Sequence, residues 1–352
     1  MKKILFEDLK PGMKLALPIR CGLSYQILLN AGTVINEKHV KRLRTLKAIE
    51  IFVHTPEFAD YPAKELYNEA VANMDEIFSE FLLEKEIDVP RVKKAVDGVI
   101  DHLTAEQHIL LQLTRLNNAD SYSVSHCVNV AIYSLFLGLK MGLSEQELRN
   151  LGLGAILHDI GKLGVPEEIL KKPQSLTDEE YSIIKNHPLE GYNALKKNDL
   201  SADARMVVRD HHERCDGSGY PFGKEEKDIH KLARIVSIAD IYDAVTADRV
   251  YRPKMLPHEG LEILLANCAG NKLDQKMVKV FMREICVYPV GSVVRLSTGE
   301  IGRVIDFPRD APYRPTVAVE RGDEVFLVNL MKEPTVFIAE IISLDQGNHN
   351  MQ

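Results

Sequence analysis

The sequence predicts a mainly α-helical protein with a small module containing β-strands at each end. Three observations support this prediction. Almost every segment between residues 90 and 286 has helical periodicity, short β-rich runs lie near both termini, and 45% of the 352 residues are apolar. That apolar content is enough for a real core and excludes the disordered and collagen-like classes. The length indicates two to three domains.

Residues 1–61 are predicted to form a small α+β module. Short β-rich runs cover residues 14–19 and 26–29 and are separated by glycines. A helix is expected over residues 36–46 and a strand around residues 49–53. Because nothing in the module suggests catalysis, a role in sensing or dimerisation is the hypothesis for it.

Residues 62–114 are predicted to form connector helices. Within residues 63–85 the apolar side chains recur at alternating spacings of four and three, which is a heptad seam. These side chains are Tyr67, Val71, Met74, Phe78 and Phe81. The pattern lasts only about two heptads, fewer than a coiled coil needs. Two interpretations stay open: a short stalk in a homodimer, or a connector helix packed within one chain.

A helical domain is predicted over residues 115–286 and a small β module over residues 287–352. Two capping boxes, in which Ser or Thr precedes Glu by three residues, indicate helix starts at Ser144 and Thr177. In the C-terminal module, β-branched runs at residues 290–296, 301–307, 316–319 and 324–329 alternate with turn residues, a spacing typical of a small barrel or meander.

Charge and cysteine content exclude several classes of protein. With 44 basic and 51 acidic residues, the net charge of −7 argues against a general nucleic-acid binder. The five cysteines contain no CxxC pair, so neither a disulfide scaffold nor a thiolate zinc module is expected. The N-terminal apolar run is too short for a signal peptide. The mostly apolar residues 128–143 fall short of the about 20 that a membrane span needs. We therefore expect a cytoplasmic protein without a membrane segment.

Histidines and aspartates gather in the helical domain in a set of short patterns. They are His126, the run His158-Asp159-Ile160-Gly161-Lys162, His187, the run HHERCDGSGYP that begins at His211 and His212, and Asp240 in DIYDA. Imidazole and carboxylate together are ligands for divalent ions such as Fe, Mn or Zn. Five histidines and two aspartates are too many for one ion. They suit a pair about 3.5–4 Å apart that acts in a phosphoryl displacement.

This set of patterns resembles the HD-GYP phosphodiesterases, a branch of the HD hydrolase superfamily that cleaves the bacterial second messenger cyclic di-GMP. The resemblance covers roughly half of the chain and implies a central all-helical HD-type domain. It also implies seven metal ligands, with Asp159 as the bridging carboxylate. The seven are His126, His158, Asp159, His187, His211, His212 and Asp240.

The resemblance bears on the number and kind of metal ions as well. Family members with three metals have a Glu four residues before the first of these histidines, where this chain has Tyr122. We therefore expect two divalent ions per chain. Fe and Mn are the first choices, and Zn, Ni, Co and Mg are alternatives.

Basic residues at matched positions imply contacts with the substrate. Lys162 follows Asp159 by three residues, so both lie on nearly the same helix face. Lys162 would offset the charge that develops on the scissile phosphate. Arg249 and Arg252 match the family's positions for the second phosphate and the guanine base, with a solvated helix charge as the alternative for each.

Four further residues receive roles from the same resemblance. Tyr220 and Asp243 are expected to contact the substrate, although Tyr220 could instead only pack the Gly-Tyr-Pro loop. Glu213 and Asp216 are expected to accept hydrogen bonds from the metal-binding histidines and so orient them. The family also uses this loop to contact diguanylate cyclases, which makes such a cyclase a candidate partner.

The expected function is a metal-dependent phosphodiesterase with Asp159 and Lys162 as catalytic residues. A hydroxide bridging two metal ions would attack cyclic di-GMP and give linear pGpG, with further hydrolysis to GMP left open. One alternative is an HD hydrolase of another cyclic dinucleotide or guanine nucleotide. The other is a non-catalytic cyclic di-GMP receptor or adaptor.

Overall fold

The structure of the chain, a computed structural model, divides into two compact units: Pro62–Ile285, and Met1–Tyr61 together with Cys286–Gln352. Each unit is described by itself. The residues that the structure describes are 2–4, 9–15, 19–20, 27–29, 33–44, 51–53, 62–84, 86–105, 122–170, 172, 174–247, 255–285, 287–308, 310–322 and 324–343.

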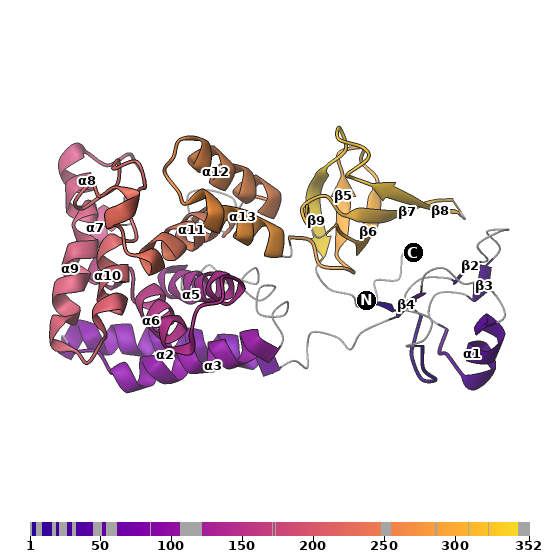
Figure 1. Ribbon diagram of the computed structural model, residues 1–352, viewed down its shortest axis with the longest axis horizontal. Helices are drawn as coiled ribbons and strands as arrows, with labels where there is room; N and C mark the ends of the chain where they lie inside the picture. Colours follow the sequence, from indigo (N-terminus) through magenta and orange to yellow (C-terminus); the bar gives the residue numbers. More distant parts are fainter. Residues whose placement is uncertain are drawn as a thin grey trace. The chain divides into compact units, whose positions relative to one another are not determined.

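The unit of residues 62–285 is built from helices, which confirms the predicted fold class (Figure 1). Its central helix, α5 (Tyr122–Lys140), packs against α6 (Glu145–Ile156) and α11 (Lys231–Thr246). Residues 124–138 of α5 are all buried, as expected of a helix that is apolar on every side. The other elements, with η for a 3₁₀-helix, are α2 (Pro62–Glu84), α3 (Val89–Ala105), η4 (Ile160–Gly164), α7 (Glu167–Leu170), α8 (Asp178–Lys185), α9 (His187–Ala194), η5 (Leu195–Lys197), α10 (Ala202–Asp210), η6 (Glu226–Asp228), α12 (Pro257–Ala269) and α13 (Gln275–Glu284).

Helices α6 and α8 begin at the two predicted capping boxes. The Ser144 hydroxyl accepts a hydrogen bond from the Glu147 backbone N–H, and the Glu147 carboxylate accepts one from the Ser144 N–H at 2.8 Å. Thr177 and Glu180 make the same reciprocal pair at α8. Each box satisfies backbone donors that the first helical turn leaves unpaired, so it fixes where the helix starts.

Helix α2 carries the predicted heptad seam, and most of that seam is buried within its own unit. Tyr67, Met74, Phe78 and Phe81 are each at most 8% exposed, and α2 packs against α3 and α5. This packing explains the apolar pattern by burial within one chain. The homodimer through residues 63–85 stays a prediction.

The N-terminal residues form small β pairs and one helix, in agreement with the predicted α+β module. Strand β1 (Lys2–Ile4) pairs antiparallel with β4 (Ile51–Val53), and β2 (Ile19–Arg20) pairs with β3 (Ile27–Leu29). Helix α1 (Glu37–Arg44) falls within the helix expected over residues 36–46. A small core joins these elements, formed by Leu9, Leu15, Ile19, Ile35 and Leu43.

The C-terminal module is a five-stranded antiparallel sheet with strand order β8-β7-β6-β5-β9 (Figure 1). Four strands match the predicted runs: β5 (Val293–Leu296), β6 (Ile301–Asp306), β7 (Thr316–Arg321) and β8 (Glu324–Asn329). The sequence analysis did not predict the fifth strand, β9 (Ile338–Ser343), which pairs with β5. The module is therefore a meander extended by one strand at its first edge.

Two further expectations concern membrane spans and the start of the helical domain. Among the described residues, the structure has no helix that is both long and apolar enough to cross a membrane. The expected boundary between connector helices and catalytic domain, at residues 114 and 115, lies outside the described residues.

Candidate metal centre

The seven predicted ligands come together in the helical unit as two clusters of side chains. They are delivered by α5, the end of α6, the start of η4, the first residue of α9, the end of α10, and α11. In each cluster, one ligand atom per residue lies within 4.8 Å of the others. One cluster contains Asp159, His187, His211 and His212, and the other contains His126, His158 and Asp240.

The carboxylate of Asp159 faces both clusters. Its Oδ1 atom lies 3.2 Å from His187 Nε2 and 3.8 Å from His211 Nε2. Its Oδ2 atom lies 3.5 Å from His158 Nε2 and 3.8 Å from His126 Nε2. A carboxylate can bind one cation through each oxygen, so this arrangement is that of a bridging ligand.

The carboxylate of Asp240 also faces both clusters, a position that was not predicted from the sequence. Its Oδ1 lies 3.3 Å from His126 Nε2, and its Oδ2 lies 3.7 Å from His212 Nδ1. The two clusters are therefore linked by two carboxylates.

Three of the histidines are oriented by the main chain. The Nδ1 atoms of His158, His187 and His211 lie 2.7–2.8 Å from the backbone carbonyl oxygens of Ala155, Ile184 and Val208, each three residues earlier. A carbonyl oxygen can only accept, so Nδ1 carries the proton and Nε2 keeps a lone pair. In each case that lone pair belongs to the nitrogen that faces Asp159.

Two polar atoms at the centre of this arrangement are buried without a hydrogen-bond partner among the described residues. They are His158 Nε2 and Asp159 Oδ1. A buried acceptor without a donor is costly, and a bound cation would satisfy both atoms. With their nitrogen and carboxylate donors, the two clusters therefore fit divalent metal ions.

The electrostatics of the site also suit cations. Burial lowers the pKa of His158 and holds the pKa of His211 and His212 well below the usual value, so these rings are neutral and able to coordinate. Burial opposes the charge of Asp159, but the cation of Lys162 and neighbouring histidines hold its pKa well below the ordinary range.

Asp243 lies behind His126, and its contact with the substrate stays a prediction. Its Oδ2 accepts a hydrogen bond from His126 Nδ1 at 2.7 Å, and its Oδ1 accepts one from Asn129 Nδ2 at 2.9 Å. Its side chain is 1% exposed. Burial lowers the pKa of His126, but hydrogen bonds to Asp240 and Asp243 outweigh it and raise that pKa to about 9. Asp243 therefore orients a candidate ligand.

Glu213 and Asp216 accept hydrogen bonds within the Gly-Tyr-Pro loop, and their role in orienting the histidines stays a prediction. The buried Glu213 carboxylate accepts hydrogen bonds from the backbone N–H groups of Phe222 and Lys224, at 2.8 and 2.9 Å. Asp216 Oδ1 accepts from the backbone N–H and the hydroxyl of Ser218. Both carboxylates thus stabilise the conformation of the loop through hydrogen bonds to its own backbone.

Replacing Glu213 with Gln is expected to destabilise the loop and leave the metal content as in the parent protein. Gln offers one acceptor where two backbone donors need one each, so a buried N–H loses its partner at a cost of about 1–3 kcal/mol. Urea unfolding measures the loss, and elemental analysis measures the metal. The exposed Glu225→Gln in the same loop is the control. Loss of metal from Glu213→Gln would instead support the prediction that Glu213 orients the metal-binding histidines.

Lys162 is placed beside Asp159 as its spacing predicts. Its Nζ lies 2.6 Å from Asp159 Oδ2, and its side chain is 35% exposed. The segment is the 3₁₀-helix η4, in which residues three apart lie directly above one another. The ammonium group therefore lies between the carboxylate and solvent, where an anionic substrate would arrive.

Tyr220 lies against the candidate ligands. Its ring centroid is 4.6 Å from that of His212, with the two rings tilted by 31°. Lys185 Nζ lies 5.6 Å from the Tyr220 ring and 4.5 Å from the ring of Tyr181. These side chains form an aromatic and basic edge next to the clusters.

Three predicted residues cannot be compared with the structure. Arg249 and Arg252 lie outside the described residues. Tyr122 is the first residue of α5, one helical turn before His126, and its side chain lies outside the described part of the chain.

Two glycines of the sequence patterns are required by close backbone contacts. A Cβ atom on Gly161 would overlap the carbonyl oxygen of His187 and lie 2.7 Å from the backbone nitrogen of Gly191. A Cβ on Gly219 would overlap the backbone of Glu213 and Arg214. The first contact seats η4 on α9, and the second folds the Gly-Tyr-Pro loop against the end of α10.

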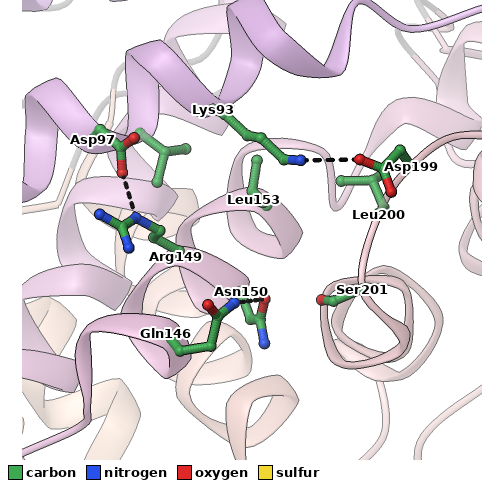
Figure 2. A pocket seen from close by; sticks show the side chains of 10 residues that line it. Lys93, Asp97, Gln146, Arg149, Asn150, Leu153, Asp199, Leu200 and Ser201 are labelled. Carbon is green, nitrogen blue, oxygen red and sulfur yellow. Dashed lines mark hydrogen bonds and ion pairs between the residues drawn. The ribbon is translucent and has the colours of Figure 1, made fainter.

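A separate hollow of about 450 Å³ lies between α3, α6 and the start of α10 (Figure 2). Its cations are already paired: Lys93 Nζ lies 3.3 Å from Asp199 Oδ2, and Arg149 Nε lies 2.9 Å from Asp97 Oδ1. None of the seven candidate ligands lines it. The two clusters, and not this hollow, are therefore the candidate functional site.

Comparison with known families agrees with this site. The HD domain family matches residues 100–277, and the family described as the KOW domain associated with HD domain matches residues 293–350. The first match covers every candidate ligand. The chain belongs to the HD domain family.

Several curated proteins are similar to this chain. Cyclic di-GMP phosphodiesterase PA4108 of Pseudomonas aeruginosa is 35% identical over 68% of this chain and 58% of its own length. Cyclic di-GMP phosphodiesterase PdeB of Borreliella burgdorferi is 31% identical over 56% and 52%. The 3′3′-cGAMP-specific phosphodiesterase 1 of Vibrio cholerae is 33% identical over 51% and 43%. The chain thus spans about half the length of these relatives.

A solved structure shares the fold. Bd1817, an HDG"Y"P protein from Bdellovibrio bacteriovorus, aligns with a TM-score of 0.52 at 19% identity, over 80% of this chain and 97% of the other. At this identity the likeness concerns the fold alone.

Proposed function

We propose that this chain is a metal-dependent phosphodiesterase that hydrolyses cyclic di-GMP to linear pGpG. The observation that carries the proposal is the pair of clusters linked by Asp159 and Asp240. Two cation sites held close together by shared carboxylates are typical of enzymes that cleave phosphate esters. Two of the relatives named above are cyclic di-GMP phosphodiesterases.

The seven candidate ligands would hold two divalent ions, one at each cluster, with Fe or Mn as first choices and Zn, Ni, Co or Mg as alternatives. Such a pair supplies positive charge for the phosphate and lowers the pKa of bound water. The cluster of Asp159 with three histidines and the cluster of Asp240 with two histidines each supply at least three donors. A carboxylate shared between the two clusters would help to hold both ions.

The other side chains of the site act on the substrate. Lys162 would stabilise the charge that builds on the non-bridging phosphate oxygens, because its ammonium already lies at the solvent edge of Asp159. Tyr220 would contact a nucleobase through its ring. Arg249 and Arg252 remain the candidates for the second phosphate and the guanine base.

A second substrate, 3′3′-cGAMP, is favoured by one observation. Among the similar curated proteins are phosphodiesterases specific for 3′3′-cGAMP, from Vibrio cholerae. This nucleotide differs from cyclic di-GMP in one base, so the same phosphate contacts would serve both. The diguanylate cyclase as a partner of the Gly-Tyr-Pro loop, and GMP as a further product, stay predictions.

Anaerobically purified full chain loaded with Mn(II) or Fe(II) tests the proposal. Cyclic di-GMP, 3′3′-cGAMP, cyclic di-AMP and a guanosine polyphosphate are incubated with it separately, and products are separated by chromatography. Two metals per chain and conversion of cyclic di-GMP to pGpG are the expected result. Faster conversion of 3′3′-cGAMP would favour the second substrate. Binding of cyclic di-GMP by metal-loaded protein without any product would identify a receptor and contradict the enzyme.

A further inference from the structure

A continuous chain of buried hydrogen bonds connects helix α2 to the candidate metal centre. The hydroxyl of Tyr67 donates to Asn129 Oδ1 at 2.9 Å, and Asn129 Nδ2 donates to Asp243 Oδ1 at 2.9 Å. Asp243 Oδ2 in turn accepts from His126 Nδ1 at 2.7 Å. All four residues are at most 8% exposed. Water therefore has little access to any link of this chain.

The donors and acceptors of the chain can be arranged in only one way. An ionised carboxylate only accepts, so Asp243 requires a donor from both Asn129 and His126. Asn129 meets this by presenting its NH₂ group, which turns its carbonyl oxygen toward the hydroxyl of Tyr67. Tyr67 therefore donates to Asn129, and both Asn129 and His126 donate to Asp243. His126 Nδ1 donates to Asp243, and Nε2 faces Asp240 and Asp159, where a bound cation would take the place of its proton.

Of the four hydrogen-bonded residues, Tyr67 alone lies outside the region that matches the HD domain family. The match begins at residue 100, whereas Tyr67 lies on α2, which packs against α5. Burial and the nearby charge of Asp243 raise the pKa of Tyr67, so its hydroxyl remains a donor. If that donor is removed, the Asn129 carbonyl loses the hydrogen bond from Tyr67, and one of the contacts that position the amide is lost.

We propose that Tyr67 is a positioning residue for the metal centre, which holds His126 in its coordinating orientation through Asn129 and Asp243. The proposal rests on the proposed function, because it requires that His126 binds metal. Partners that orient a metal-ligating histidine commonly change metal affinity by about 10–100-fold. Since Tyr67 acts through two intermediate residues, we expect the lower end of that range.

The test is Tyr67→Phe, which removes the hydroxyl and keeps the buried ring. The expected result is an approximately tenfold weaker Mn(II) affinity by calorimetric titration, together with an altered visible spectrum of the Co(II)-loaded protein. The spectrum reports coordination geometry, which a purely structural role would leave unchanged. Tyr133→Phe is the matched control, because Tyr133 is also buried and lies on α5, where its ring packs against Tyr242 and Phe281.

A double-mutant cycle tests whether Tyr67 acts on His126 through Asn129. Asn129→Leu breaks the next link and is expected to weaken Mn(II) affinity at least as much as Tyr67→Phe. The double variant should then bind as weakly as Asn129→Leu alone, because the tyrosine has no route left to His126. Additive losses would overturn the proposal. Circular dichroism and thermal unfolding without metal identify any variant that fails to fold.

The outcomes separate this proposal from the proposed function. Parent-like Mn(II) affinity and Co(II) spectrum in Tyr67→Phe would overturn the role of Tyr67 while leaving the metal centre intact. Failure of the parent protein to bind Mn(II), Fe(II) or Co(II) would overturn both.

Discussion

Replacing Asp159 with Ala is expected to abolish metal retention and phosphodiester hydrolysis together. One oxygen of this carboxylate faces each cluster, so the substitution removes a ligand from both candidate sites at once. It also leaves Lys162 without the carboxylate that lies 2.6 Å from its ammonium. Elemental analysis for metals per chain and chromatography of the cyclic di-GMP reaction measure the two effects. We expect both the metal content and the turnover of this variant to be at background.

The control for this variant is Asp199→Ala in the same unit. The Asp199 side chain is 98% exposed and pairs only loosely with Lys93, at 3.3 Å. Exposed pairs of this kind contribute little to stability, so metal content and activity should match the parent. Hydrolysis by Asp159→Ala at the parent rate would refute the assignment of the site.

Replacing Gly161 with Ala is expected to disrupt the site although it removes no ligand. The added methyl group would overlap the backbone of His187, which forces η4 away from α9. These two elements carry Asp159 and His187, so their separation pulls apart one of the two clusters. The expected result is destabilisation by about 3 kcal/mol or more, with loss of metal.

A neighbouring glycine provides the control for Gly161→Ala. Gly164 lies in the same 3₁₀-helix, and a Cβ atom there would meet nothing within 4 Å. Gly164→Ala should therefore unfold near the parent temperature and retain metal. Thermal unfolding and metal analysis of both variants decide the matter. Equal stability of the two variants would mean that the close contact between η4 and α9 is not required.

The sequence was sufficient to predict which side chains form the candidate metal centre. The resemblance of the short patterns to a known family implies seven histidines and aspartates as ligands, and all seven lie in two clusters. The sequence says less about which groups the surrounding carboxylates contact. Asp243 turns toward His126, and Glu213 turns toward the backbone of its own loop. Sequence spacing does not determine such choices, because they depend on which buried donors need an acceptor.

The fold shows the same difference between local and distant information. Capping boxes lie within four residues of chain, and both were predicted correctly. Strand β9 was missed because its partner β5 lies far away in the sequence: Arg295 bonds to Glu340, 45 residues later. The hydrogen-bond chain from Tyr67 to His126 also spans long sequence distances. The heptad pattern predicted a packed face for α2, but it carried no sign that one tyrosine in it would donate to a polar side chain.

The three histidines held by backbone carbonyls have a consequence for how this centre can change over evolution. The partners of His158, His187 and His211 are main-chain atoms of Ala155, Ile184 and Val208. A point substitution at those three positions replaces a side chain and leaves the carbonyl in place. These hydrogen bonds therefore place no requirement on the side chains at the three positions, and packing alone constrains Ala155 and Val208, which are at most 1% exposed. By contrast, the orientation of His126 can be lost through a single inherited substitution at Asp243.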